Sequence, residues 1–428
     1  MRTTAPSRLR PHLAGVSLAI SQLLLSAARA DDQAPAPPPT SPAPAPAVAT
    51  SEKWTYGFAT RVGDARPWLE ETTGTRYWIN PEYLLWGVRR ESLPGPFVTT
   101  GGPADPNAGV PGSPTTAVLF DGHDLRYGAI NGGRLSAGVS PDGSPYGVDA
   151  NVFFLEKKHN HFDIQSDALG NPLIAIPVNL FGMGVTAIHV AEPNTISGGV
   201  HIDSTISLWG AEANAARTWI VVDQCAAVNL FAGIRFLEMN EAFKMSTNSH
   251  DINSGDNFSS FDSFGARNRF VGFQVGADVA WRWDHISLGA FNKLAVGSTE
   301  ARIEVNGMRT GLTIAGNSVP SAGFLATTST AGGVLTSPSN IGTFNRDHLA
   351  VVDEIGVNAN FEICEGVAVT AGFSFLFWSD VARAGDQIST IVAPVGVTPP
   401  ANAVLPGPNN HITDFWAYGA NLGLEFRY

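Results

Sequence analysis

Apolar and polar side chains alternate at every second position along several stretches of this chain. Successive side chains of a β-strand point to opposite faces, so this spacing predicts strands with one apolar face and one polar face. The alternation is clearest at the C-terminus, where Glu425 and Arg427 share the polar parity with Gly419, Asn421 and Gly423. The other parity there is apolar: Tyr418, Ala420, Leu422, Leu424, Phe426 and Tyr428.

The same alternation predicts ten strands in all. An even number suits a barrel whose two chain ends lie on the same side of a membrane. Strand ends read from a pattern carry errors of several residues, so twelve strands is the alternative count. The ten expected strands are 77–89, 133–139, 146–155, 202–213, 228–239, 270–281, 285–296, 349–361, 367–377 and 415–428.

The connections between these strands alternate in length. Short turns follow Val139, Ala213, Trp281 and Phe361. The remaining connections are long and rich in Gly, Ser, Asn, Pro and Thr: 90–132, 156–201, 240–269, 297–348 and 378–414. Long loops on one side and short turns on the other predict an all-β, up-and-down antiparallel transmembrane barrel with long outer loops and short periplasmic turns.

One stretch, 173–190, is apolar enough and just long enough to suggest a membrane-spanning helix. Pro177, Gly182 and Gly184 disfavour a helix there. We therefore place 173–190 in a long loop or a plug.

If the apolar parity faces lipid, the polar parity faces the lumen. Ten charged positions then line the interior: Glu82, Arg134, Asp149, Glu212, Arg235, Asp278, Lys293, Glu354, Glu425 and Arg427. The outward face collects Tyr83, Leu85, Val148, Val152, Phe154, Ile234, Phe236, Val271, Phe273, Val275, Ile286, Leu288, Val357, Phe361, Phe373, Phe375 and Phe377. The six acids and four bases of the lumen set can largely pair with one another.

Two functions are compatible with such an interior. In a wide lumen the charges would set ion selectivity, whereas about eight strands leave room only for side chains. Ten strands therefore favour a porin-like channel of narrow or gated lumen, which passes small solutes. The alternative is a structural or surface-interaction barrel whose lumen is closed by salt bridges and transports nothing.

Composition fits an exported membrane protein. Only 15% of the residues are charged, against 45 Gly, 24 Phe and 10 Trp, where a soluble protein is nearer a quarter charged. Cys225 and Cys364 fall in two different short turns almost opposite each other in the ring, so we expect no disulfide between them.

The N-terminus has the form of a secretory signal peptide, residues 1–30. Basic residues precede the apolar stretch 13–25, which ends at Ala28-Arg29-Ala30, so we expect cleavage after Ala30. Loss of its four arginines moves the formal net charge from −12 to −16, which disfavours nucleic acid as a partner. Residues 31–53 form a Pro/Ala-rich tether, 54–76 a lead-in and 77–428 the barrel.

Candidate chemistry is sparse. His159 and His161, with Asp163 two positions on, form a conceivable metal clamp, but a polar loop start is the commoner meaning of such a run. His201, His285 and His348 lie at or near strand ends, yet no nucleophile motif accompanies them. We expect no metal, no cofactor and no enzymatic activity.

Several stretches resemble one family: 79–86 (INPEYLLW), 134–138 (RLSAG), 208–214 (LWGAEAN), 267–270 (RNRF), 377–381 (FWSDV), 385–388 (GDQI), and the DFW and GLEFRY of the last strand. They are similar, in this order, to the β-barrel porin-7 family of planctomycete outer-membrane proteins. The resemblance implies an outer-membrane barrel in contact with lipid, and it implies transport by name only. The aromatic C-terminal strand resembles the signal read by the barrel-assembly machinery. In the 378–414 connection we expect a loop tucked into the barrel mouth, with Trp378 at the membrane interface.

Overall fold

The computed structural model describes residues 75–122, 125–142, 144–180, 184–221, 226–283, 285–311, 329–389, 391–392, 409 and 411–428. All of them belong to one compact unit, Lys53–Tyr428. The signal peptide, the tether, most of the lead-in and Cys225 lie outside the described residues. Cys364 is a free, exposed thiol.

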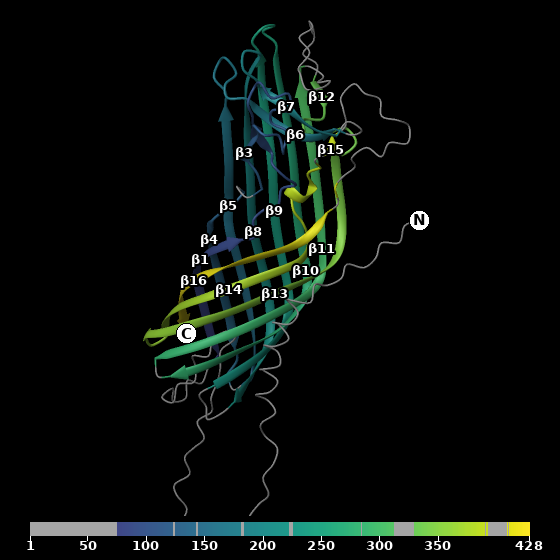
Figure 1. Cartoon of the computed structure of the whole chain (residues 1–428). Coiled ribbons are helices and arrows are strands. Elements are labelled where there is room, and N and C mark those ends of the chain that lie inside the picture. Colours follow the sequence, from purple (N-terminus) through teal and green to yellow (C-terminus); the bar gives the residue numbers. More distant parts are fainter. Residues whose placement is uncertain are drawn as a thin grey trace, which may run out of the picture. The chain divides into compact units, whose positions relative to one another are not determined.

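Ten antiparallel strands form a closed ring, as the alternation predicts (Figure 1). Each strand pairs with its neighbours along the chain, and the first pairs with the last, so that Tyr77 and Tyr428 exchange backbone hydrogen bonds of 3.1 and 2.9 Å. The ring consists of β1 (Arg76–Val88), β4 (Ala129–Ser140), β5 (Tyr146–Gln165), β8 (Ile196–Val221), β9 (Ala226–Asp251), β10 (Asn257–Trp283), β11 (Ile286–Thr310), β13 (Gly342–Cys364), β14 (Val367–Ala382) and β16 (Ile412–Arg427).

The start of β1 and the end of β16 lie on the side of the barrel that carries the short turns. We call this side the turn end and the opposite side the loop end. Six strands, β5, β8, β9, β10, β11 and β13, continue well past the other four toward the loop end (Figure 1). The predicted long connection 240–269 is therefore wrong: β9 and β10 fill it, and only residues 252–256 turn between them. Its many Ser and Asn residues suggested a loop, although Phe243 and Met245 keep the alternation.

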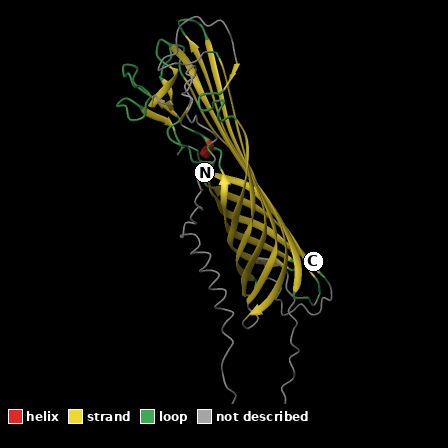
Figure 2. Cartoon of the chain, turned by 90° about the vertical axis from the view of Figure 1, so that its right-hand side faces the viewer, coloured by secondary structure: helices red, strands yellow, loops and turns green. Residues whose placement is uncertain are grey.

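A second, small sheet packs against this extension (Figure 2). Its strands come from the long connections: β2 (Val98–Thr100), β3 (Ala117–Phe120), β6 (Ile174–Leu180), β7 (Gly184–Ala191) and β15 (Ile391–Val392). The stretch 173–190, which we expected in a long loop or a plug, contains β6 and nearly all of β7, which pair with each other. Ile174, Ile176 and Val178 share a buried core with Ile202 and Phe243 of the long strands. Two further short elements are β12 (Ser329–Ala331), which pairs with β11, and the 3₁₀ turn η1 (Gly385–Gln387). No helix within the described ranges has the length and apolar character needed to cross a membrane.

In the part of the barrel near the turn end, apolar side chains cover the outside and charged side chains lie inside. Phe154, Ile234, Val271 and Phe273 are 55–65% exposed, and most of the predicted outward set is similarly exposed. Arg235, Asp278 and Glu354 are at most 2% exposed. A water-soluble protein buries apolar groups and exposes charges, so this inverted arrangement is typical of a membrane barrel.

Candidate functional site

The barrel interior is stacked in layers, and β9 shows their order. Its inward positions from the turn end toward the loop end are Arg235, Leu237 and Met239, Glu241, and then Phe243 and Met245, all buried. From the turn end, an ionic layer, a hydrophobic layer and a second polar group therefore follow one another along the barrel axis. They are followed by the buried core at the loop end that contains Phe243 and Met245, which we call the upper core.

In the ionic layer, six of the ten predicted lumen charges form one continuous chain of ion pairs. Glu82 and Arg134 are 3.8 Å apart (Oε2 to Nη1), and Arg134 Nη2 donates to Glu354 Oε1 at 3.0 Å. Glu354 also accepts from Arg235, whose Nη1 is 3.7 Å from Glu212 Oε2. Lys293 donates to Glu212 and ends the chain. Positive and negative groups thus alternate across the lumen.

The strands that carry these charges show that the pairs span the interior. Arg134 stands on β4 and Glu354 on β13, which are not neighbours in the ring, and the same holds for Glu212 on β8 and Lys293 on β11. All six side chains are at most 8% exposed. Buried charges need partners, because an unpaired one costs several kcal/mol of desolvation.

The other four predicted lumen residues lie outside this chain of charges. Asn214 Nδ2 donates to Asp149 Oδ1 and Asn229 Nδ2 donates to Asp278 Oδ2, both at 2.8 Å. Arg427 Nε donates to Glu425 Oε1 at 2.8 Å, within β16 near the turn end. The sequence parity placed all ten positions on the inner face, but it could not tell which charges meet.

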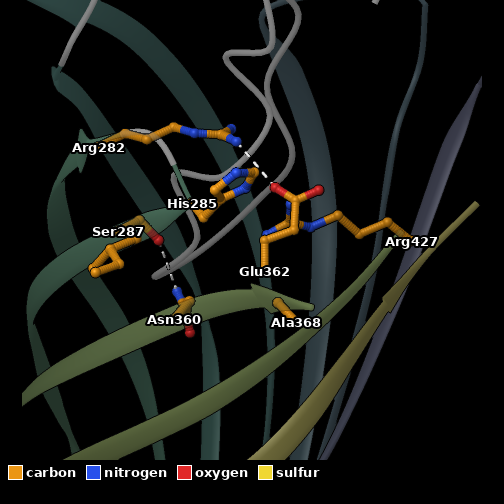
Figure 3. Close-up of a pocket in the computed structure, with 8 residues that line it drawn as sticks. Arg282, His285, Ser287, Asn360, Glu362, Ala368 and Arg427 are labelled. Atoms are coloured by element: carbon orange, nitrogen blue, oxygen red, sulfur yellow. Dashed lines mark hydrogen bonds and ion pairs between the residues drawn. The ribbon is translucent and has the colours of Figure 1, made fainter. Parts of the chain in front are cut away.

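A small polar pocket opens beside Arg427 near the turn end (Figure 3). Arg282 Nη2 lies 3.1 Å from Glu362 Oε2, and Asn360 Nδ2 donates to Ser287 Oγ at 3.3 Å. The remaining lining residues are His285, Ile286 and Ala368. Two arginines are largely matched by Glu362 and Glu425, so the pocket carries little net charge for a ligand.

The hydrophobic layer receives a buried side chain from every strand of the ring. Trp86 and Trp378 are its largest members, and both are fully buried. Each indole N–H has a partner, because Trp86 donates to Asn421 at 2.8 Å and Trp378 to Thr299 at 2.9 Å. The other members from the strands are Leu84, Ile130, Phe153, Leu155, Ile206, Leu208, Leu237, Met239, Phe270, Ala295, Ala350, Val352, Leu376, Val381, Phe415 and Ala417.

This layer and the ionic layer are in contact. The Arg134 guanidinium carbon lies 5.5 Å from the centre of the Trp86 ring and 5.7 Å from that of Phe153, and such cation–π contacts are favourable. The expected place of Trp378 at the membrane interface is wrong. Its position on the inward parity of β14 directs it into the lumen, where Phe270 packs 6.2 Å away.

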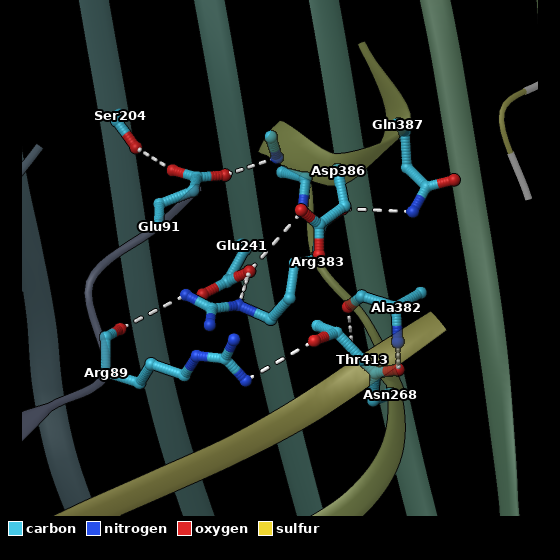
Figure 4. Close-up of polar contacts among 12 residues, drawn as sticks. Arg89, Glu91, Ser204, Glu241, Asn268, Ala382, Arg383, Asp386, Gln387 and Thr413 are labelled. Atoms are coloured by element: carbon cyan, nitrogen blue, oxygen red, sulfur yellow. Dashed lines mark hydrogen bonds and ion pairs between the residues drawn. The ribbon is translucent and has the colours of Figure 1, made fainter. Parts of the chain in front are cut away.

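Above the hydrophobic layer, two carboxylates and one arginine form a buried polar junction (Figure 4). Glu91 accepts from Ser204 Oγ at 2.7 Å and from the Gly385 N–H at 2.6 Å. Arg383 Nε donates to Glu241 Oε2 at 2.6 Å, and its Nη2 donates to the Arg89 carbonyl at 3.2 Å. The junction ties the segment after β1 and the segment after β14 to the walls of β8 and β9.

Two of the family-like stretches, 267–270 and 385–388, lie at this junction. The Asn268 side chain donates to the Ala382 carbonyl at 2.7 Å and accepts from the Ala382 N–H at 2.8 Å, which fixes the end of β14 on β10. Gln387 donates to the Arg383 and His411 carbonyls at 3.1 and 2.8 Å. The expected tucked loop thus begins with residues 383–388, several of which are buried.

Sequence reasoning missed this junction for two reasons. Glu241 follows Arg235 on the same parity of β9, but the expected strand ended at Met239. Glu91 and Arg383 lie outside the strands, where side-chain direction has no period to follow. A longer count of the β9 alternation could have found Glu241; no sequence signal points to the other two.

Glu91 makes the stability of the barrel depend on pH. Burial and the nearby Glu241 carboxylate raise the pKa of Glu91 to about 7, from an ordinary 4.5. The folded protein therefore holds a proton that the unfolded chain has lost between these values, so the free energy of unfolding falls as pH rises from about 4.5 to 7. We expect Glu91→Gln to remove a pH-dependent loss on the order of 3 kcal/mol.

The measurement is urea unfolding of the two proteins at pH 5 and pH 8. Glutamine keeps an acceptor for Gly385 and a donor toward Ser204, so the packing is retained. Glu300→Gln, at an exposed site on β11, should leave the native pH dependence in place. An equal pH slope in the native protein and Glu91→Gln would contradict the expectation.

The histidines of the conceivable metal clamp and His201 lie on the outer face of the extended strands, whereas His285 lines the pocket near the turn end. His159, His161 and Asp163 belong to β5 rather than to a loop, and His201 lies within β8. As the side chains stand, the described part of the chain gathers no three His, Cys, Asp or Glu residues in a position to hold a metal ion.

An antiparallel ring with an apolar exterior and a charged interior defines the class of outer-membrane β-barrels. The family comparison is more specific. Residues 78–428 match the family described as "Putative beta barrel porin-7 (BBP7)", so the chain belongs to this family of outer-membrane barrels, as the resemblance predicts. A comparison with curated proteins finds no match.

Solved structures give distant likenesses. The outer membrane protease OmpT from Escherichia coli aligns with 84% of this chain and 99% of its own, at 10% identity and a TM-score of 0.38. A Pseudomonas aeruginosa FadL homologue aligns with 83% of this chain and 90% of its own, at 9% identity and a TM-score of 0.23. The translocator domain of the autotransporter NalP from Neisseria meningitidis gives 10% identity, coverages of 84% and 90%, and a TM-score of 0.19.

Proposed function

We propose that this protein is an outer-membrane barrel with a closed lumen. Its loop end, where the small sheet packs against the extended strands, serves for interactions outside the membrane. The observation that carries the proposal is the hydrophobic layer. All ten strands contribute buried side chains to it, and the ionic layer lies directly below.

The residues that close the lumen belong to the strands of the barrel. Trp86, Phe270 and Trp378 stand on β1, β10 and β14, so displacing a loop would not remove them. The ionic layer by itself would be compatible with the narrow or gated channel expected from the sequence. To conduct, such a channel would have to hydrate a layer whose two tryptophans are fully buried.

The interaction role follows from what the loop end contains. Membrane barrels carry their longer connections on the outer side, and here those connections and the long strands build a two-layer structure with its own core. A side-chain core fixes the shape of that surface, as recognition of a partner requires. We propose no catalytic role.

The test is electrical recording of the refolded mature protein in a planar lipid bilayer. We expect no stable current steps from protein whose fold is verified by its heat-dependent migration on gels. Reproducible steps with a defined ion preference would overturn the closed lumen and restore the channel.

A further inference from the structure

Five metal-ligating side chains gather on one exposed face of β5 and β8. Phe162 and Ile164 of β5 pack against the upper core, so His159, His161 and Asp163 of the opposite parity face outward. The register sets His161 opposite Asp203 of β8 and Asp163 opposite His201. These residues lie beyond Phe154 and Trp209, the outermost exposed aromatics of the two strands, and thus outside the apolar belt.

Two of the histidines already hold carboxylates through the same ring nitrogen. His201 Nδ1 is 2.5 Å from Asp163 Oδ1, and His159 Nδ1 is 3.4 Å from Asp203 Oδ1. The Asp163 carboxylate on His201 Nδ1 leaves Nε2 of that ring open, which is the arrangement that commonly orients a metal-binding imidazole. His159 must instead give up its contact with Asp203 for that carboxylate to bind a metal. About half of each imidazole is exposed (54% for His159 and 53% for His201), so an ion can reach Nε2.

We propose that this face binds a divalent late transition metal, Zn²⁺ in the first instance, through His159, His161 and Asp203. Histidines at i and i+2 of a strand share a face, and the carboxylate directly across the pair lies with its Cβ about 4.5–5.5 Å from that of His161. Two imidazoles and a carboxylate suit Zn²⁺, whose bonds to them are about 2.0–2.2 Å. The pair His201–Asp163 stands beside them as a further imidazole donor.

The site closes by rotation of exposed side chains, because no three of the five converge in the metal-free arrangement. Lys244 of β9 is directly opposite Asp203 on its other side, and the contact that the metal must replace at that carboxylate is the one with His159 Nδ1. The main cost of binding is therefore the loss of weak, solvent-exposed pairs.

A metal ion at this site would stabilise the edge of the sheet that the loop-end part of β5 forms. The pairing of β4 with β5 ends at Gly132 and Leu155, so residues 158–165 of β5 form strand pairs with β8 alone. An ion bridging β5 to β8 would hold this edge strand against opening.

The experiment is calorimetric titration of the refolded full-length mature barrel with ZnCl₂ at pH 7.5. We expect one ion per chain and binding weakened by about 10-fold or more in His159→Ala and in His161→Ala. His250→Ala, an exposed histidine on β9 outside the cluster, is the matched control and should bind as the native protein does.

All three substituted residues are exposed, so the variants should fold, and heat-dependent gel migration verifies this. Native protein that takes up no zinc overturns the site. Equal affinity in the native protein and both cluster variants, or an equal loss in His250→Ala, overturns the assignment of its ligands.

Discussion

Replacing both Trp86 and Trp378 with alanine is expected to make the barrel conduct, whereas the native protein stays silent. The two indoles are the largest fully buried side chains of the hydrophobic layer and stand on β1 and β14. Their removal opens space at two positions of the layer, one of them beside Arg134, so that water can reach the ionic layer. The measurement is planar-bilayer recording, in which we expect small stepwise currents.

The double variant will also be less stable, since truncating a buried tryptophan costs about 3–5 kcal/mol. Each single variant is therefore recorded as well, and heat-dependent gel migration establishes which proteins are folded. Trp281→Ala is the matched control, because Trp281 is 44% exposed on the outside of β10. Folded double variants that stay as silent as Trp281→Ala would show that the seal lies elsewhere.

The ring of strands follows from the sequence because its physics is local. A strand with lipid on one side and a polar interior on the other must alternate, and β1, β14 and β16 alternate over nearly the whole of their length. The extension of β9 and β10 was missed because outside the membrane most outward positions are polar or small residues, such as Ser, Asn and Gly. Those residues are equally common in loops, so only the inward Phe243, Met245 and Phe264 carry the signal.

Parity predicts which side chains share the inner face of the strands, but it does not predict which of them meet. Parity alone puts Arg134 and Glu354 on the inner face, yet 220 residues separate them along the chain. Their contact depends on the tilt and closure of the whole ring, which no local pattern encodes. The hydrophobic layer was missed for a related reason: Trp86 and Trp378 stand at inward positions, where the alternating pattern predicts polar side chains.

The largest loss of stability from a single change of charge is expected at Glu354. This carboxylate accepts from both Arg134 and Arg235, so Glu354→Gln leaves three buried cations facing Glu82 and Glu212. Removing one partner of a buried pair costs about 3–5 kcal/mol, because the remaining charge stays desolvated. Urea unfolding of the refolded barrel measures this, with Glu300→Gln, at an exposed carboxylate, expected to change the free energy of unfolding by less than about 0.5 kcal/mol.

A double variant separates charge balance from packing. Changing Glu354 and Arg235 together to leucine leaves two balanced pairs, Glu82 with Arg134 and Glu212 with Lys293. The double variant should therefore lose less stability than the sum of the losses in Glu354→Leu and Arg235→Leu, and the double-mutant cycle should give a coupling of about 0.5–3 kcal/mol. If the two single losses simply add, the alternating charges do not act as a unit, and shape alone would account for the closed lumen.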